Sequence, residues 1–201
     1  MSIDRSGLEF TLNMPDWAEA ELAKLPTHVA TLAERMDIVN HFAALNVKND
    51  TGGPFAAGIF EKESGKLIVI GVNRVVPKNC SPAHAEVMTI ALAQNKLNTF
   101  DLGGPGQPEH QMVVNWRPCA MCYGAVVWSG IRSLAIAGSG PELEEITGFD
   151  EGPIHPEWQK ELEKRGIEVI DGINTEGSIE VFRQFAATGR VVYNGRLGNA
   201  D

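Results

Sequence analysis

Residues 81–86 read Ser-Pro-Ala-His-Ala-Glu, and residues 118–122 read Pro-Cys-Ala-Met-Cys. In each stretch the proline suits the first position of a helix, where no backbone N–H donor is needed. The serine that opens the first stretch is a good N-cap. We therefore predict that His84 and Glu86 lie at the very start of one helix, and that both cysteines of the second stretch lie in the first turn of another.

Strand and helix patterns alternate on both sides of these two stretches. Residues 55–61 and 66–75 have the pattern of strands joined by a short glycine-containing loop, which predicts a hairpin. Further periodic runs predict strands over 112–116, 133–137 and 167–170, and helices over 82–97, 118–128, 141–146, 157–165 and 179–187. A hairpin followed by alternating strands and helices predicts an α/β fold, a three-layer α/β/α sandwich with a mixed five-stranded sheet.

The chain contains no internal repeat and no linker pattern, so we predict one domain over residues 1–201. Within it, residues 1–50 form a helical N-terminal extension, in which Pro26 separates a short helix from one over about 27–47. Residues 52–175 form the core of the domain, and residues 176–201 form a C-terminal helix and tail.

The composition is that of an ordinary globular protein, with 43% hydrophobic and 21% charged residues. Its apolar runs are too short to span a bilayer and its N-terminus lacks a secretory pattern, so we expect a cytoplasmic protein without a membrane partner. The net charge is −9, with 17 basic against 26 acidic residues. Because nucleic-acid binding relies on clustered Lys and Arg, we expect a small uncharged substrate and no nucleic-acid partner.

The cysteine spacing indicates metal chemistry. The chain has three cysteines, of which Cys119 and Cys122 form a C-x-x-C pair. Zinc binds imidazole nitrogen and thiolate sulfur, and a catalytic zinc site uses three protein ligands and leaves the fourth position to water. Residues three apart on a helix share a face, so both sulfurs can meet His84 at one Zn²⁺ ion per chain. Glu86 is then placed to take a proton from the metal-bound water.

The same residues allow a different class of function. A closed structural zinc site needs a fourth protein ligand, and Cys80 is the candidate. Because Cys80 precedes the expected N-cap, we expect it to point away along the incoming loop. The alternative from this class is a non-catalytic, zinc-stabilised interaction protein.

The pair of motifs, H-x-E followed by P-C-x-x-C, resembles the cytidine/deoxycytidylate deaminase superfamily. The resemblance covers about two-thirds of the chain, from the turn before Phe55 to beyond Asp150. More narrowly, the chain looks like the guanine deaminase branch of bacterial type. The resemblance implies a cytidine deaminase-like fold with five core strands, a zinc-dependent nucleobase deaminase and a homodimer. It also implies that the C-terminal segment can close a pocket, either that of its own chain or that of the neighbouring chain.

Four stretches carry the narrower resemblance: Gly52–Phe55, Gly71–Asn73, Met121–Ala125 with the later Trp128, and Gly148–Glu151. They imply that Asn73 binds the base, that Phe55 stacks on it, that Trp128 lines the pocket, and that Asp150 and Glu151 supply a second carboxylate. Each residue also has a plain structural explanation. Asn73 could end a strand in a turn, the aromatic residues could belong to the core, and the acidic pair could form a solvated loop.

The resemblance implies hydrolysis of guanine to xanthine and ammonia. Zinc-bound hydroxide attacks C6 of guanine, Glu86 shuttles protons to the ring and to the leaving ammonia, and Glu151 contacts the base and shares the proton transfer. The alternatives are a tRNA adenosine deaminase and a deaminase of cytosine, cytidine or aminotriazines such as ammeline. The chain departs from much of the superfamily at Arg117, where an acidic residue is common, which leaves the role of that position open.

Overall fold

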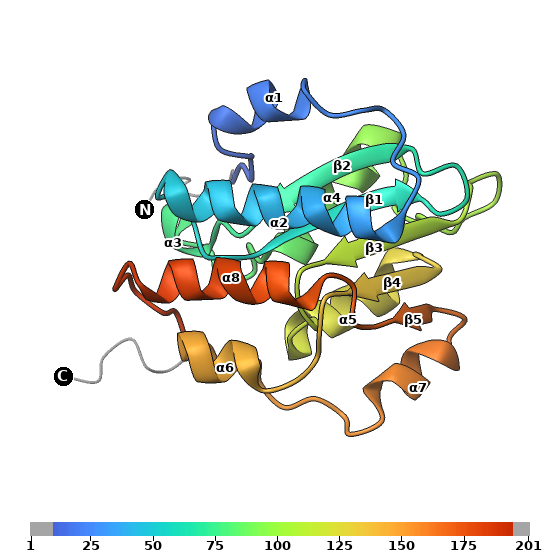
Figure 1. The fold of residues 1–201 in the computed structure, drawn as a ribbon. Coiled ribbons are helices and arrows are strands. Elements are labelled where there is room, and N and C mark those ends of the chain that lie inside the picture. Colours follow the sequence, from blue (N-terminus) through green and yellow to red (C-terminus); the bar gives the residue numbers. More distant parts are fainter. Residues whose placement is uncertain (1–9, 195–201) are drawn as a thin grey trace, which may run out of the picture.

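The computed structural model describes residues 10–194, so both ends of the predicted domain, residues 1–9 and 195–201, lie outside the described part. Its centre is a five-stranded sheet in the order β2-β1-β3-β4-β5 (Figure 1). The strands are β1 (Ala56–Glu61), β2 (Leu67–Val72), β3 (His110–Val114), β4 (Ser133–Ile136) and β5 (Glu168–Ile170). β2, β1 and β3 pair antiparallel, whereas β3, β4 and β5 pair parallel. The predicted hairpin and mixed sheet are confirmed.

Helices cover both faces of this sheet (Figure 1). They are α1 (Trp17–Leu22), α2 (Leu32–Lys48), α3 (Val75–Lys78), α4 (Ala85–Leu97), α5 (Ala120–Ser129), α6 (Glu142–Thr147), α7 (Trp158–Glu163) and α8 (Thr175–Ala186). One buried cluster joins α2, α6 and α8 to one face, and a second joins α4, α5 and α7 to the other. Successive strand residues belong to opposite clusters, as Phe60 and Ile59 do. The structure is the three-layer sandwich that the sequence predicts.

The two site-bearing helices begin slightly later than predicted. His84, not Ser81, is the N-cap of α4, and Cys119 is the N-cap of α5. Residues 80–84 form a tight turn instead, in which the Ala83 N–H donates to the Cys80 carbonyl at 3.0 Å and the His84 N–H to the Pro82 carbonyl at 2.8 Å. The prolines thus precede the helices, and the ligand residues take the capping positions.

Close backbone packing fixes α4 against the sheet. A Cβ at Gly71 in β2 would lie 2.3 Å from Thr89 Oγ1 and 2.8 Å from Thr89 N, so only glycine allows this approach. The Thr89 hydroxyl donates to the Ala57 carbonyl of β1 at 3.1 Å. This contact sets where the N-terminus of α4 lies relative to the strand ends.

Two helices nearer the ends of the chain, α2 and α8, also begin at other residues than predicted. α2 begins at Leu32 and not near residue 27, because the Thr27 carbonyl accepts from Leu67 N–H at 2.9 Å and extends the sheet edge. α8 begins at Thr175, earlier than the predicted 179, because Asn174 caps it by accepting from Gly177 N–H at 3.3 Å. Within residues 10–194, none of the helices has the length and apolarity required to cross a lipid bilayer.

The N-terminus of α2 carries a complete capping box, which generates a stability prediction. Thr31 Oγ1 accepts from Glu34 N–H at 3.2 Å, and Glu34 Oε2 accepts from Thr31 N–H at 3.0 Å. Thr31→Ala should therefore lower the free energy of unfolding by about 1 kcal/mol. Urea denaturation measures this loss, and Thr31→Ser, which keeps the hydroxyl, is the matched control. Equal stability of the Ala and Ser variants would contradict the assignment.

Candidate active site

The predicted metal ligands converge at the start of α4 and α5. The ligand atoms of His84, Cys119 and Cys122 all lie within 4.8 Å of one another. His84 Nδ1 and Cys119 Sγ are 3.5 Å apart. Two ligands on one tetrahedral zinc, with bonds of about 2.0 and 2.3 Å, would lie roughly 3.6 Å apart. The donor set and its spacing therefore fit zinc.

The group contains three ligands, and within the described part of the chain no fourth His, Cys, Asp or Glu joins it. Cys80, the candidate for a closed site, is a free thiol outside the group. Three protein ligands are the number that a catalytic zinc site uses. The arrangement is thus compatible with zinc that keeps a position for water.

The two sulfurs are electrostatically unequal before metal binds. A hydrogen bond from Cys122, assisted by one from His84, lowers the pKa of the Cys119 thiol to about 4 although burial opposes the shift. The same bond to Cys119, together with burial, raises the pKa of Cys122 well above its usual value. One sulfur is therefore already a thiolate at neutral pH, and zinc would displace the proton from the other.

Glu86 lies beside this cluster without belonging to it. It is in the first turn of α4 and is 6% exposed. Burial, reinforced by the negative charge of Cys119, raises the pKa of its carboxyl to about 7, whereas the positive charge of His84 opposes this. A carboxyl that titrates near neutrality can accept a proton in one step and return it in the next.

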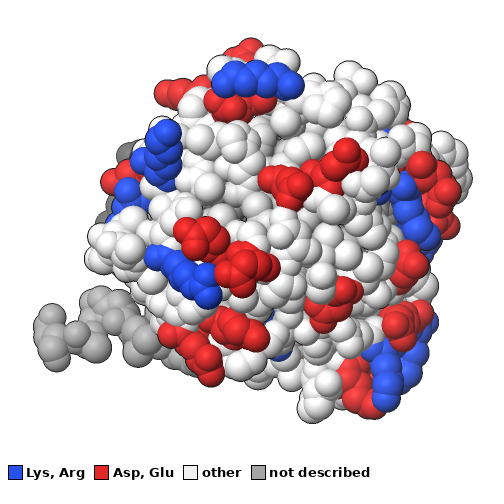
Figure 2. Space-filling view, viewed as in Figure 1, with Lys and Arg blue, Asp and Glu red and all other residues white. Residues whose placement is uncertain are grey.

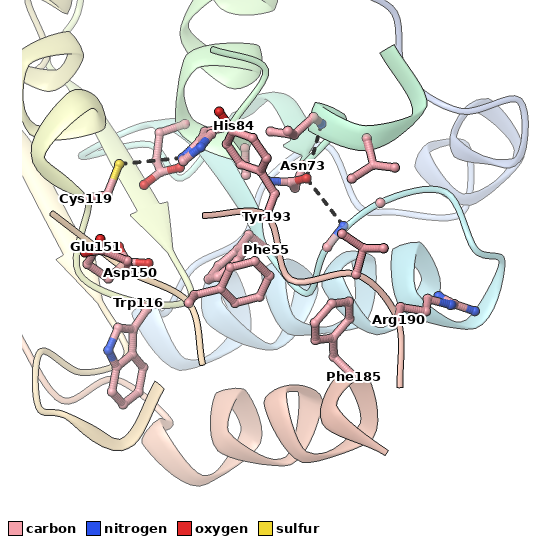
Figure 3. Close-up of a pocket in the computed structure, with 18 of the residues that line it drawn as sticks. Phe55, Asn73, His84, Trp116, Cys119, Asp150, Glu151, Phe185, Arg190 and Tyr193 are labelled. Atoms are coloured by element: carbon pink, nitrogen blue, oxygen red, sulfur yellow. Dashed lines mark hydrogen bonds between the residues drawn. The ribbon is translucent and has the colours of Figure 1, made fainter. Parts of the chain in front are cut away.

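These groups open into a cavity of about 370 Å³, a volume within the range of small-molecule sites (Figure 3). Its lining includes most of the predicted site residues: Phe55, Asn73, His84, Glu86, Cys119, Asp150 and Glu151. Cys122 is fully buried and lies outside this lining. The cavity therefore combines one imidazole, one sulfur and buried carboxyls with mostly apolar walls.

Asn73 is held rigidly at the end of β2. Its Oδ1 accepts from Gly53 N–H at 3.4 Å and from Val75 N–H at 3.3 Å (Figure 3). A Cβ at Gly52 would lie 1.9 Å from the Asn73 carbonyl oxygen, which explains the glycine before this contact. The Asn73 Nδ2 group has no hydrogen-bond partner among residues 10–194, so it remains available as a donor to a ligand in the cavity.

Phe55 belongs to both the wall and the core. Its ring meets Phe149 edge-on at a centroid distance of 5.1 Å, and Phe182 at 5.9 Å. Phe149 in turn stacks on Phe185 at 5.4 Å. The core-packing explanation therefore applies to Phe55, and its place in the cavity lining leaves the stacking role a prediction.

Glu151 is a second buried carboxyl on the cavity wall, and is 9% exposed. Burial and then the negative charges of Cys119 and Glu86 raise its pKa to about 8, against the opposing charges of His84 and then Arg117. Its backbone carbonyl accepts from Ala120 N–H at 3.0 Å, which ties it to the metal-binding helix. Asp150 also borders the cavity but is exposed, and its Oδ1 accepts from Gly152 N–H at 2.8 Å.

The prediction that Trp128 lines the pocket is wrong. Trp128 is 87% exposed on the outer side of α5 and is not among the described residues that line the cavity. The buried side of α5 runs through Cys122, Val126 and Ser129. Trp128, six residues after Cys122, falls about 120° away from that side around the helix.

The resemblance implies that the C-terminal segment can close a pocket, but the sequence does not identify which of its residues line the cavity. Residues 189–193, which follow α8, contribute Arg190 and Tyr193 to the lining of this chain's own cavity (Figure 3). Arg190 Nε lies 3.0 Å from Asp50 Oδ1. The available signal was the run of apolar residues at 191–193 in an otherwise polar tail.

Arg117 and Trp116, which precede the P-C-x-x-C motif, also line the cavity. Arg117 lies 3.8 Å from Glu144 and brings a positive charge toward Glu151. Arg117, which stands where an acidic residue is common in the superfamily, therefore places a positive charge where the cavity already holds acidic groups.

Comparison with known proteins agrees with this geometry. Residues 31–137 match the family model of the cytidine and deoxycytidylate deaminase zinc-binding region. The guanine deaminase of Bacillus subtilis is 32% identical over 146 residues, covering 72% of this chain and 88% of that relative.

Two solved structures share the fold across nearly the whole chain. One, described as a guanine deaminase from Nitrosomonas europaea, is 41% identical with a TM-score of 0.84, covering 89% of this chain and 97% of that chain. Another, a complex with 2,6-diaminopurine, is 42% identical with a TM-score of 0.84, covering 92% of this chain and 97% of that chain. Motif, fold and comparisons agree, and the chain belongs to the cytidine and deoxycytidylate deaminase family.

Proposed function

We propose that this protein is a zinc-dependent hydrolase that converts guanine to xanthine and ammonia. The observation that carries the proposal is the presence of two buried carboxyls, Glu86 and Glu151, in one cavity with the three-ligand cluster. The similarity to guanine deaminases and to a protein that binds 2,6-diaminopurine supports a purine base as the substrate.

The cavity offers groups that complement guanine. Asn73 Nδ2 is a free donor for an acceptor atom of the base, and the Glu151 carboxyl can accept from a ring N–H. Phe55 provides an aromatic surface for the flat ring. An analogue without the ring N–H would leave the buried Glu151 oxygens unpaired, so this pairing favours guanine over such analogues.

The reacting carbon must be C2, because C2 carries the amino group of guanine whereas C6 carries an oxygen in both guanine and xanthine. The attack at C6 expected above is therefore wrong on chemical grounds. The base consequently enters with its C2 edge toward Glu86 and a ring N–H toward Glu151.

Zinc held by His84, Cys119 and Cys122 would supply a Lewis acid that makes a water molecule a better nucleophile. Glu86 accepts a proton from the attacking water and delivers it to N3 as the oxygen bonds to C2. Glu86 then transfers the second proton to the amino group, the C2–N bond breaks, and ammonia leaves. Residues 189–193 border the cavity and help to exclude bulk water.

A tRNA adenosine deaminase remains the principal alternative activity. The net charge of −9 favours a small substrate, and on the face shown in Figure 2 Lys and Arg are scattered among more numerous acidic side chains. The C-terminal segment along the cavity would also hinder a base that is attached to a polynucleotide. The same zinc chemistry can deaminate free cytosine, cytidine and aminotriazines such as ammeline. Only the fit of each compound to the cavity separates them from guanine, so substrate assays must include them.

We further propose a homodimer in the cytoplasm, built from a single-domain chain over residues 1–201. The sequence of α5 contains no charged residue, and its outer side exposes Met121 and Trp128, an apolar surface suited to a second copy. None of the three cysteines, all of which lie in the described part of the chain, forms a disulfide, which suits a reducing compartment. α2 packs on the sheet and on α8, which supports a single folding unit.

The first test is an ammonia-release screen of zinc-loaded protein with guanine, guanosine, adenine, cytosine, cytidine and ammeline. We expect ammonia from guanine and none from guanosine. Glu86→Gln should lower kcat by about 10²- to 10⁴-fold because it removes the proton acceptor, while metal analysis still finds one zinc per chain. Ammonia from cytidine alone, or full activity of Glu86→Gln, would refute the proposal, and inactive wild-type protein would favour a structural zinc site.

The second test concerns Glu151. Glu151→Gln presents an amide donor to the ring N–H of the base, so kcat/KM for guanine should fall by about ten- to a hundredfold. Steady-state kinetics measures the change, and Glu145→Gln, an equal substitution on the exposed side of α6, is the matched control. Unchanged kcat/KM in Glu151→Gln would show that this carboxyl does not contact the base.

A further inference from the structure

The C-terminal segment contacts the loop that presents Glu151. Immediately after the cavity-lining residues 189–193, Asn194 Nδ2 donates to the Gly148 carbonyl at 2.8 Å. Asn194 Oδ1 accepts from Asp150 N–H, also at 2.8 Å. Both halves of one amide side chain therefore bind the backbone directly before Glu151.

The other side of Glu151 is fixed to the metal-binding helix. Its carbonyl accepts from the N–H of Ala120, which lies between the two cysteine ligands. Gly148 and Gly152, which flank this short stretch, both have positive φ angles, of 77° and 69°. The backbone at Glu151 is thus held between Ala120 on one side and Asn194 on the other.

We infer that Asn194 is a positioning residue for Glu151. By clamping residues 148–150, it couples the placement of the C-terminal segment along the cavity to the placement of the Glu151 carboxyl against the base. The inference rests on the proposed function, because it takes Glu151 to contact the substrate. It gives the last described residue of the chain a role in the reaction and not merely in covering the site.

Arg190 provides the comparison that separates positioning from covering. It anchors the same segment elsewhere, donating from Nη1 to the Val47 carbonyl at 2.6 Å and pairing with Asp50. Neither contact touches the loop before Glu151. Loss of the Arg190 side chain should loosen the C-terminal segment along the cavity without moving Glu151. Loss of the Asn194 side chain should also displace Glu151.

A double-mutant cycle tests this distinction. Asn194→Ala should lower kcat on the order of ten- to a hundredfold with zinc content unchanged, because a small displacement of a contacting group is costly. In the Glu151→Gln background, Asn194→Ala should lower kcat only about twofold, since the carboxyl that Asn194 positions is already lost. Arg190→Ala should mainly raise KM and act independently of Glu151→Gln. Gln184→Ala, exposed on α8, is the control for handling and folding.

If kcat of the double variant falls by the full product of the factors seen in Asn194→Ala and Glu151→Gln, the inference is overturned. Hydrogen–deuterium exchange supplies a readout that needs no substrate: the Asp150 amide should exchange faster in Asn194→Ala and at the wild-type rate in Arg190→Ala. Unchanged Asp150 exchange in Asn194→Ala would also overturn it. If guanine releases no ammonia, the proposed function fails. The hydrogen–deuterium exchange measurement still decides whether Asn194 holds the loop. The double-mutant cycle is then carried out with whichever base is deaminated.

Discussion

Two helix N-termini converge at one point, and the metal-ligand cluster, the cavity and the position of Glu86 all follow from this arrangement. α4 and α5 lie on the same face of the sheet and begin next to each other, and their N-cap residues, His84 and Cys119, approach within 3.5 Å. A capping residue has an extended backbone and stands in the positive field of the helix dipole. That field favours a thiolate, and the helix turn brings Cys122 to the same spot. Glu86 is in the first turn of α4, so the same convergence places its carboxyl for the proposed proton transfer.

The fold serves this convergence through close contacts between layers. Gly71 lets α4 approach β2 and β1, and Gly52 lets the loop after α2 approach Asn73. Neither position admits a side chain without moving backbone atoms. The cavity is then finished by segments from opposite ends of the chain, since α2 precedes the Asp50 loop and α8 precedes Arg190. The metal-ligand cluster and Glu86 thus come from the middle of the sequence, whereas this outer wall comes from segments nearer its ends.

The sequence predicts the parts of this site that are encoded locally. The metal-ligand set and the position of Glu86 can be predicted because short spacings within two helix starts fix their relative positions. The strands can be predicted because they are short apolar runs. Trp128 was misplaced because α5 is apolar on every side, so its pattern does not reveal which side is buried. Asn194 was missed because its partners are 44 and 46 residues away and its contacts are polar and few. Long-range contacts of a tail leave no periodic signal in the sequence.

The proposed reaction requires that three protein side chains hold zinc and leave one position for solvent. X-ray absorption spectroscopy of the zinc-loaded protein measures this directly, because sulfur and nitrogen or oxygen neighbours differ in number and bond length. We expect two sulfurs at about 2.3 Å, one imidazole nitrogen at about 2.0 Å and one further light atom from water. A third sulfur, a second imidazole, or no zinc bound at stoichiometric level would contradict it.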